Sequence, residues 1–305
     1  GIRDIGVTGV QTCALPISIW SERGPSGTTI DAGRQRILTA SLNGDPAWTK
    51  EASFHGVTFT NGYAQVGPNY SYDSLVRLNS GTLGFYDCVF RENEVKANNN
   101  IVTHVFILGV GYPADSGARF LLRNTLFTGN KISSGGTVAN SGVGGGAVVY
   151  SGGNASNSVI DRSTFIRNEL YTQPNYSTTN GHRRVIEGFR VTNTVVWSND
   201  VLLQPAFPSG LLTPAAIFSP AVGYSYVDVP GTAASYANSL TNPPIFVSAE
   251  TGNFDPATNS PAFQAGDPAS PPNPDGSRAD IGYSSARVLP DDKWVNALPG
   301  FTNNS

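Results

Sequence analysis

The chain has 305 residues, a formal net charge of −3 and only 13% charged residues, about half the share found in an ordinary globular protein. Hydrophobic residues make up 39% of the chain, which is enough to bury a core and excludes wholesale disorder. Lysine and arginine form no basic stripe, and this argues against nucleic acid as a partner because phosphate neutralisation needs clustered cations. No apolar run reaches the roughly 18 residues that a membrane span needs.

The first 18 residues are predicted to be non-native. Residues 7–17 back-translate in frame to a widely used short-read sequencing adapter, and residues 1–4 back-translate to its upstream part. The sequence also contains no methionine. We therefore expect that the true N-terminus, with the signal peptide of an exported protein, has been lost, and that the folded domain spans residues 19–285. The alternative is an amphipathic strand over residues 5–17.

One sequence phrase recurs along the chain. In each copy small or polar residues precede alternating apolar residues, then comes an aromatic residue or a valine, and an asparagine follows three positions later. Five copies end in an asparagine, at Asn61, Asn93, Asn130, Asn168 and Asn199, and the copy that ends at Asn61 is one residue shorter than the others. Their spacings of 32, 37, 38 and 31 residues indicate a fixed structural element joined by loops of different length.

The phrase predicts a strand, because polar and apolar residues alternate with period two and β-branched and aromatic residues dominate. A second short apolar run precedes the later copies, at residues 75–78, 105–108, 147–150 and 185–187. Two strands per repeat predict a coil that stacks on the next coil at a spacing of about 4.8 Å. The terminal asparagines are predicted to form a hydrogen-bonded ladder at the corners, since asparagine tolerates left-handed backbone angles. The alternative for these asparagines is sugar or metal binding.

This pattern resembles the right-handed parallel β-helix of the pectin-lyase-like superfamily over roughly residues 26–285. Residues 252–267 and 274–282 resemble the closing segment of bacterial surface proteins of the choice-of-anchor Q type, which carry repeats like those of polymorphic outer membrane proteins. The chain departs from that segment at Phe263, Gln264 and Tyr283. We therefore predict an all-β fold, a right-handed parallel β-helix solenoid with irregular loop insertions. Residues 286–305 are expected to be a tail or a truncated linker.

The resemblance implies a secreted or cell-surface bacterial domain that binds a polysaccharide or a cell-surface glycan, or that mediates adhesion. Aromatic faces stack on sugar rings, and tyrosines interrupt the coils. The predicted ligand-binding residues are Tyr70, Tyr72, Tyr112, Tyr171, Tyr176, His182 and Arg183. The alternative is that the tyrosines only cover strand edges. The protein is expected to be monomeric.

The main alternative function is a polysaccharide lyase or a glycoside hydrolase acting on an acidic polysaccharide. A lyase needs a group that neutralises the substrate carboxylate and a base that abstracts the adjacent proton. Stacking of three coils would bring together a candidate catalytic patch of Arg77, His104, Arg184 and Glu187. The competing interpretation is a solvated outer face with ion pairs. The motifs of polygalacturonase-type β-helices are missing inside the coils, which counts against an inverting hydrolase.

No cofactor is predicted apart from calcium, for which there is one candidate site. Oxygen ligands surround the proline-rich part of the closing segment, at Asp267, Asn273, Asp275 and Asp280. Turn formation explains the Asp-Gly pair at 275–276 equally well. Cys88 has apolar neighbours and is expected to be a small buried residue rather than a catalytic thiol. A structural stalk that presents another domain is the remaining alternative function.

Overall fold

The computed structural model describes residues 17–42, 51–66, 72–97, 104–110, 118–134, 146–151, 158–172, 183–202, 217–218, 221–228, 238–240 and 242–285. Most of the segment predicted to be non-native (residues 1–16) and the predicted tail (286–305) lie outside these ranges. The described residues form a parallel β-helix whose only helix is a 3-10 turn, η3 (Ala249–Thr251). No helix among them is long and apolar enough to cross a membrane.

Two of the sheets contain seven parallel strands each. Sheet A consists of β1 (Ile17–Trp20), β4 (Glu51–His55), β8 (Thr82–Tyr86), β12 (Arg119–Arg123), β16 (Val159–Asp161), β20 (Arg190–Thr192) and β24 (Ala221–Gly223). Sheet B consists of β2 (Thr29–Asp31), β5 (Thr58–Thr60), β9 (Val89–Arg91), β13 (Leu126–Thr128), β17 (Thr164–Ile166), β21 (Val195–Trp197) and β25 (Tyr226–Val227).

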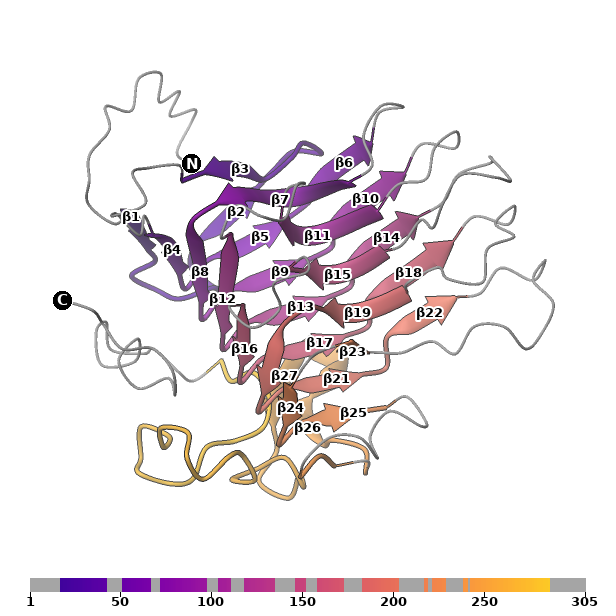
Figure 1. Cartoon of the computed structure of the whole chain (residues 1–305). Coiled ribbons are helices and arrows are strands. Elements are labelled where there is room, and N and C mark those ends of the chain that lie inside the picture. The colour runs from indigo at the N-terminus through magenta and orange to yellow at the C-terminus, as the bar shows by residue number, and fades with distance from the viewer. Residues whose placement is uncertain are drawn as a thin grey trace.

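The other two parallel sheets complete each coil, so that the strands stack from one end of the molecule to the other (Figure 1). Sheet C has six strands: β3 (Leu38–Ser41), β7 (Tyr72–Ser80), β11 (His104–Val110), β15 (Gly146–Tyr150), β19 (Arg183–Glu187) and β23 (Ile217–Phe218). Sheet D has five: β6 (Tyr63–Val66), β10 (Glu94–Ala97), β14 (Lys131–Ser134), β18 (Glu169–Thr172) and β22 (Asp200–Leu202).

The all-β solenoid was predicted correctly, but a full coil contains four strands where the sequence indicated two. The repeated phrase forms two strands, such as β8 and β9, because the chain turns in its middle. The turning residues have φ between 48° and 53° and are Asp87, Asn124, Arg162 and Asn193. The apolar alternation continues across this corner, so its period does not reveal the turn. The strand in sheet D was missed because these short strands bury few apolar residues, for example Val95 in β10.

The core is a column of apolar side chains enclosed by the four sheets. Phe59, Phe90, Phe127 and Phe165 stack along the inner face of sheet B with ring centroids 4.7, 4.9 and 4.6 Å apart. These distances match the separation of neighbouring strands, about 4.7–4.9 Å, so the parallel register itself places each ring on the next. Cys88 is fully buried in this core, as expected, and burial raises the pKa of its thiol to about 12.

The predicted asparagine ladder is present, and its members are Asn93, Asn130, Asn168 and Asn199. Nδ2 of each of the first three donates to the Oδ1 of the asparagine in the following coil, at 2.9, 2.8 and 2.8 Å, and Nδ2 of Asn199 donates to backbone carbonyls. Asn61 is not a member, because its copy of the phrase is one residue shorter. Gly62 takes the ladder position and donates its backbone N–H to Oδ1 of Asn93 at 2.9 Å. Asn61 instead turns the chain with φ 55° and donates to Asp31.

Residues 242–285, which we call the C-terminal strap, run back along the outside of the helix (Figure 1). The strap contains the antiparallel pair β26 (Phe246–Ser248) and β27 (Asn253–Pro256). Its side chains Phe254 and Tyr283 pack against outward-facing residues of sheet B, namely Val89, Leu126 and Ile166. These apolar side chains would face water without the strap, so the hydrophobic effect explains why the closing segment lies on this sheet.

Candidate functional site

A groove of about 900 Å³ lies on the outer face of sheet B, between the first coil and the C-terminal strap. Its floor is formed by outward side chains of neighbouring strands, which include Thr58, Val89, Leu126 and Thr128. One wall is the segment 20–26 at and after the end of β1, and the opposite wall is formed by strap residues 250–255, 283 and 285. A volume of this size lies at the upper end of the range for ligand sites, roughly 300–1,000 Å³.

A stack of three aromatic rings stands at the corner of the groove between sheets A and B. Trp20, His55 and Tyr86 occupy one register row of β1, β4 and β8. The Trp20 and His55 rings are 3.6 Å apart and nearly parallel, and the His55 and Tyr86 rings are 4.7 Å apart. Trp20 and His55 line the groove. Because His55 covers one face of the indole, the 45% exposure of Trp20 lies on the other face and on the ring edge.

Charged side chains stand at the opposite corner, between sheets B and D. Arg91 and Glu92 are exposed and line the groove, and no hydrogen bond or ion pair engages either side chain within the described part of the chain. Two other carboxylates of the groove are engaged: Asp87 accepts from Asn124 at 2.5 Å, and Asp255 accepts from Ser285 at 2.6 Å. The groove therefore offers an aromatic face, hydroxyl groups and both signs of charge to a polar ligand.

The tyrosine of the groove is held in its neutral form. Burial, reinforced by the nearby charges of Asp255 and Asp87, raises the pKa of the Tyr283 phenol well above its ordinary value. The phenol therefore keeps its proton at neutral pH and is available to the groove only as a neutral hydroxyl.

The predicted catalytic patch is brought together only in part. Arg184 and Glu187 form an ion pair of 3.2 Å with 13% and 17% of their side chains exposed. Arg77 shares the register row of Glu187 but lies three strands away, which at about 4.8 Å per strand is roughly 14 Å. Its Nε donates to Asn79 at 3.0 Å instead. His104 begins β11, and its side chain lies outside the described structure.

All seven predicted ligand-binding side chains lie outside the described structure. The backbone lies outside it as well for Tyr70, Tyr112, Tyr176 and His182. Only the backbone is described for three others, which lie on β7, β18 and β19: Tyr72, Tyr171 and Arg183. Their role in binding stays a prediction.

The three aspartates among the predicted calcium ligands each accept a hydrogen bond within the strap, whereas Asn273 donates from Nδ2 to Ser277 and to the carbonyl of Arg278. Asp267, Asp275 and Asp280 accept, through Oδ1, the backbone N–H groups of Ala269, Ser277 and Gln264 at 2.9, 2.9 and 2.7 Å. Among the described residues no group of three or more His, Cys, Asp or Glu side chains is placed to hold a metal ion. Calcium binding by this segment therefore stays a prediction without geometric support.

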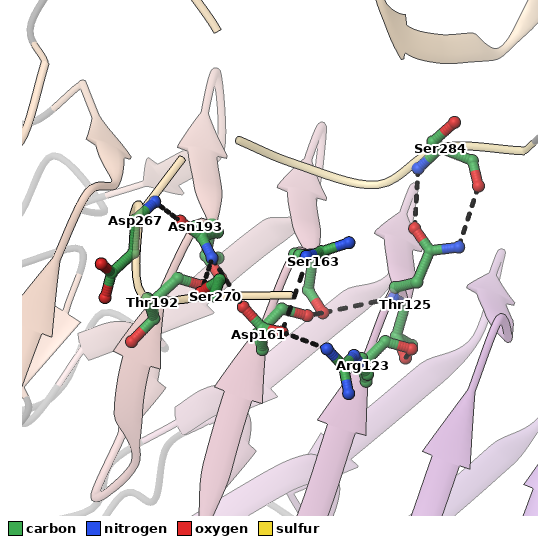
Figure 2. Close-up of polar contacts among 12 residues, drawn as sticks. Arg123, Thr125, Asp161, Ser163, Thr192, Asn193, Asp267, Ser270 and Ser284 are labelled. Atoms are coloured by element: carbon green, nitrogen blue, oxygen red, sulfur yellow. Dashed lines mark hydrogen bonds and ion pairs between the residues drawn. The ribbon is translucent and has the colours of Figure 1, made fainter. Parts of the chain in front are cut away.

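A buried polar cluster lies where the strap meets the corner between sheets A and B (Figure 2). Arg123 and Asp161 form an ion pair of 3.2 Å, and 3% and 5% of their side chains are exposed. The other carboxylate oxygen of Asp161 accepts from Asn193 at 2.9 Å. Asn193 in turn donates to Ser270 at 2.8 Å and accepts from the backbone of Asp267 at 2.6 Å. The cluster thus attaches the strap to the coils.

The aromatic stack and this cluster could not be found from the sequence repeats. Their residues stand on the outer face of sheet A, where the phrase carries a different residue type in each coil. The parallel register alone places Trp20, His55 and Tyr86 in one row. The large aromatic residues at the last position of β1 and of β8 could have indicated the stack, but only after these strands had been aligned with each other.

His55 predicts a pH dependence of stability. Burial lowers the pKa of its imidazole from 6.5 to about 4, so the unfolded chain binds a proton at a higher pH than the folded protein. The free energy of unfolding is therefore unaffected by this group above pH 6.5 and falls as the pH drops from 6.5 to 4. After allowance for partial solvent exposure we expect a loss of about 1–2 kcal/mol.

Thermal unfolding followed between pH 4 and pH 7 measures this effect, with His55→Phe as the control that keeps an aromatic ring in the stack. The variant is expected to lose less stability than the native protein over this interval. Equal pH profiles would show that His55 titrates normally. The comparison of the two proteins cancels the contributions of other groups, such as Glu51, whose pKa is raised by burial.

Comparisons with protein-family models and with curated proteins found no match for this chain.

Proposed function

We propose that this chain is a carbohydrate-binding β-helix domain of the pectin-lyase-like type, placed outside a bacterial cell, which holds an extended glycan in the groove on sheet B. The resemblance of the strap to the closing segment of choice-of-anchor Q surface proteins belongs to this proposal. The observation that carries it is the Trp20 ring, which is 45% exposed and stacked on His55 at the edge of the groove.

The chemistry of the groove supports a polyhydroxylated ligand. An aromatic face provides apolar contact area at a low cost in conformational entropy, which is why tryptophan is frequent among residues that dominate binding. Threonine hydroxyls on the floor and the side chains of Arg91 and Glu92 at the far corner can exchange hydrogen bonds with sugar hydroxyls. A floor bounded by two walls suits a chain molecule better than a compact ligand.

We expect Trp20→Ala to weaken glycan binding by about tenfold or more, because the substitution removes the exposed ring. The native protein and the variant are compared by retention on immobilised polysaccharides in a panel of neutral and uronate-containing chains. Tyr63→Ala is the matched control. Tyr63 is a partly exposed aromatic residue on sheet D that contacts Arg34 and does not line the groove.

The result that contradicts binding in this groove is equal retention of the native protein and Trp20→Ala. Absence of retention on the whole panel would contradict glycan binding itself and would favour a structural stalk. Loss of retention in both variants would point to unfolding, which circular dichroism detects.

The alternative function, a polysaccharide lyase or a glycoside hydrolase, is supported by the half-buried pair of Arg184 and Glu187 on sheet C. The same uronate panel tests it when the absorbance of an unsaturated product and the release of reducing ends are followed. Turnover that disappears in Arg184→Ala would replace the binding-only proposal with an enzymatic one. Binding without turnover supports the proposal as stated.

A further inference from the structure

The wall of the groove opposite Trp20 is made by two separate parts of the C-terminal strap. The first is β27 with the residues before it, and the second is the pair Tyr283 and Ser285. Asp255 joins the two parts, because its carboxylate accepts from both the backbone N–H and the hydroxyl of Ser285 at 2.6 Å. A displacement of either part would therefore displace the other.

The residue between the two wall positions, Ser284, is bound to the coil at two points (Figure 2). The amide of Asn124 donates from Nδ2 to the carbonyl of Ser284 at 2.9 Å and accepts the N–H of Ser284 at 2.8 Å. This pairing resembles that of a neighbouring β-strand, and it fixes both position and direction of the backbone. Both residues are buried: Asn124 has no exposed surface and Ser284 has 9%.

Asn124 is itself held in one orientation. It turns the chain between β12 and β13 with φ 48°, and its Nδ2 also donates to Asp87 at 2.5 Å. The neighbouring strap residues fit closely at the same place, since Tyr283 donates its N–H to Thr164 Oγ1 at 2.8 Å. A Cβ on Gly282, whose φ is 108°, would lie 3.0 Å from that oxygen. The strap can therefore lie this close to the coil only because residue 282 is a glycine.

We propose that the C-terminal strap is a functional wall of the glycan groove, and that Asn124 is the positioning residue that sets this wall against the floor. The inference rests on the proposed function, because the wall matters only if the groove binds a ligand. Asn124 touches no ligand in this scheme. It acts through Ser284 on Tyr283 and Ser285, which line the groove on either side of the bound position.

The test replaces Asn124 with glycine, which tolerates the positive φ and removes only the amide. Asn61→Gly is the matched control, because Asn61 also has a positive φ of 55° at a corner but donates to Asp31 and, among the described residues, forms no hydrogen bond with the strap. Gly282→Ala disturbs the same attachment from the strap side and leaves the coil sequence intact. Hydrogen exchange of the amides of residues 282–285 and retention on the polysaccharide panel are both measured.

We expect Asn124→Gly and Gly282→Ala to speed exchange in the strap by about tenfold or more while the amides of β13 and β17 stay protected. Both variants are expected to lose glycan affinity about tenfold, and Asn61→Gly is expected to lose neither protection nor affinity. Unchanged strap exchange in Asn124→Gly would overturn its positioning role. Faster amide exchange in the strap combined with unchanged glycan affinity would overturn the proposal that the strap is a wall of the binding groove.

The exchange measurement needs no ligand, so it separates the inference from the proposed function. If the native protein retains no glycan, the proposed function fails and the strap is no wall of a glycan site. The exchange of residues 282–285 still decides whether Asn124 positions the strap. If the native protein binds glycan and only Trp20→Ala weakens binding, the proposed function stands and the wall is rejected.

Discussion

Replacing Asn168 with alanine is expected to lower the free energy of unfolding by about 3–5 kcal/mol. Asn168 is fully buried in the middle of the ladder, and its amide makes bonds in both directions. Nδ2 donates to Asn199 at 2.8 Å and to the carbonyl of Phe127 at 3.0 Å. Oδ1 accepts from the side chain of Asn130 at 2.8 Å and from its backbone at 3.2 Å. Alanine leaves several of these buried groups without a partner, and each costs about 1–3 kcal/mol.

Chemical denaturation followed by circular dichroism measures this change. Asn61→Gly is the control, because Asn61 is exposed and stands outside the ladder, and we expect it to cost less than about 1 kcal/mol. Asn168→Asp separates donor from acceptor: the carboxylate still accepts from Asn130 but can no longer donate to Phe127 or Asn199. Similar small losses for all three variants would show that the ladder contributes little to the stability of the stacked coils.

Replacing Asp161 with alanine is the second substitution with a large expected effect, about 3–5 kcal/mol. Asp161 is the carboxylate that faces the buried guanidinium of Arg123 at 3.2 Å, and Nε of Arg162 lies 3.8 Å from the same oxygen. Its removal takes the negative charge away from two arginines that are 3% and 0% exposed. It also removes the acceptor that orients Asn193 toward the strap.

The exposed pair of Lys131 and Glu169, at 3.4 Å, provides the control for this charge effect. Lys131→Ala is expected to cost less than about 1 kcal/mol, because the lysine side chain is 57% exposed and solvent screens the pair. Equilibrium denaturation compares the single variants with the double variant Arg123→Met, Asp161→Leu. The double variant should recover part of the loss, since it removes the Arg123 charge together with the Asp161 carboxylate and leaves only the charge of Arg162 in the cluster. A double variant less stable than Asp161→Ala would contradict an electrostatic origin.

The corner asparagines show how far the repeat pattern could be used. Four of the five terminal asparagines form the ladder that the phrase predicted, because a buried corner repeated in each coil needs the same side chain each time. The fifth, Asn61, differs because it stands one position before the ladder position: Phe59 pairs with Phe90 and Tyr63 with Glu94, so Gly62 lies opposite Asn93. The sequence shows this difference as a shorter phrase, but only the structure shows that Gly62 takes the place of the asparagine and donates to Asn93.

The candidate site was much harder to predict. The residues proposed from the sequence were charged and aromatic ones near the insertions, and of these only Arg184 and Glu187 are shown in contact. The groove lies instead on sheet B, and one of its walls belongs to the C-terminal strap. Ser284 of the strap is bound by Asn124, which is 160 positions away in the sequence. No local pattern reports a contact of that kind, because it depends on where the strap returns.

The sequence by itself determined the all-β solenoid, its corner ladder and its buried Cys88, because these features repeat with each coil and depend on local alternation and turn chemistry. The tertiary structure alone decided the four-strand coil, the stack of Trp20 on His55 and the groove beneath the strap. The physical reason is the parallel register: it brings residues from successive coils within about 5 Å of one another whatever their type. Outer-face side chains therefore acquire neighbours that no repeat in the sequence specifies.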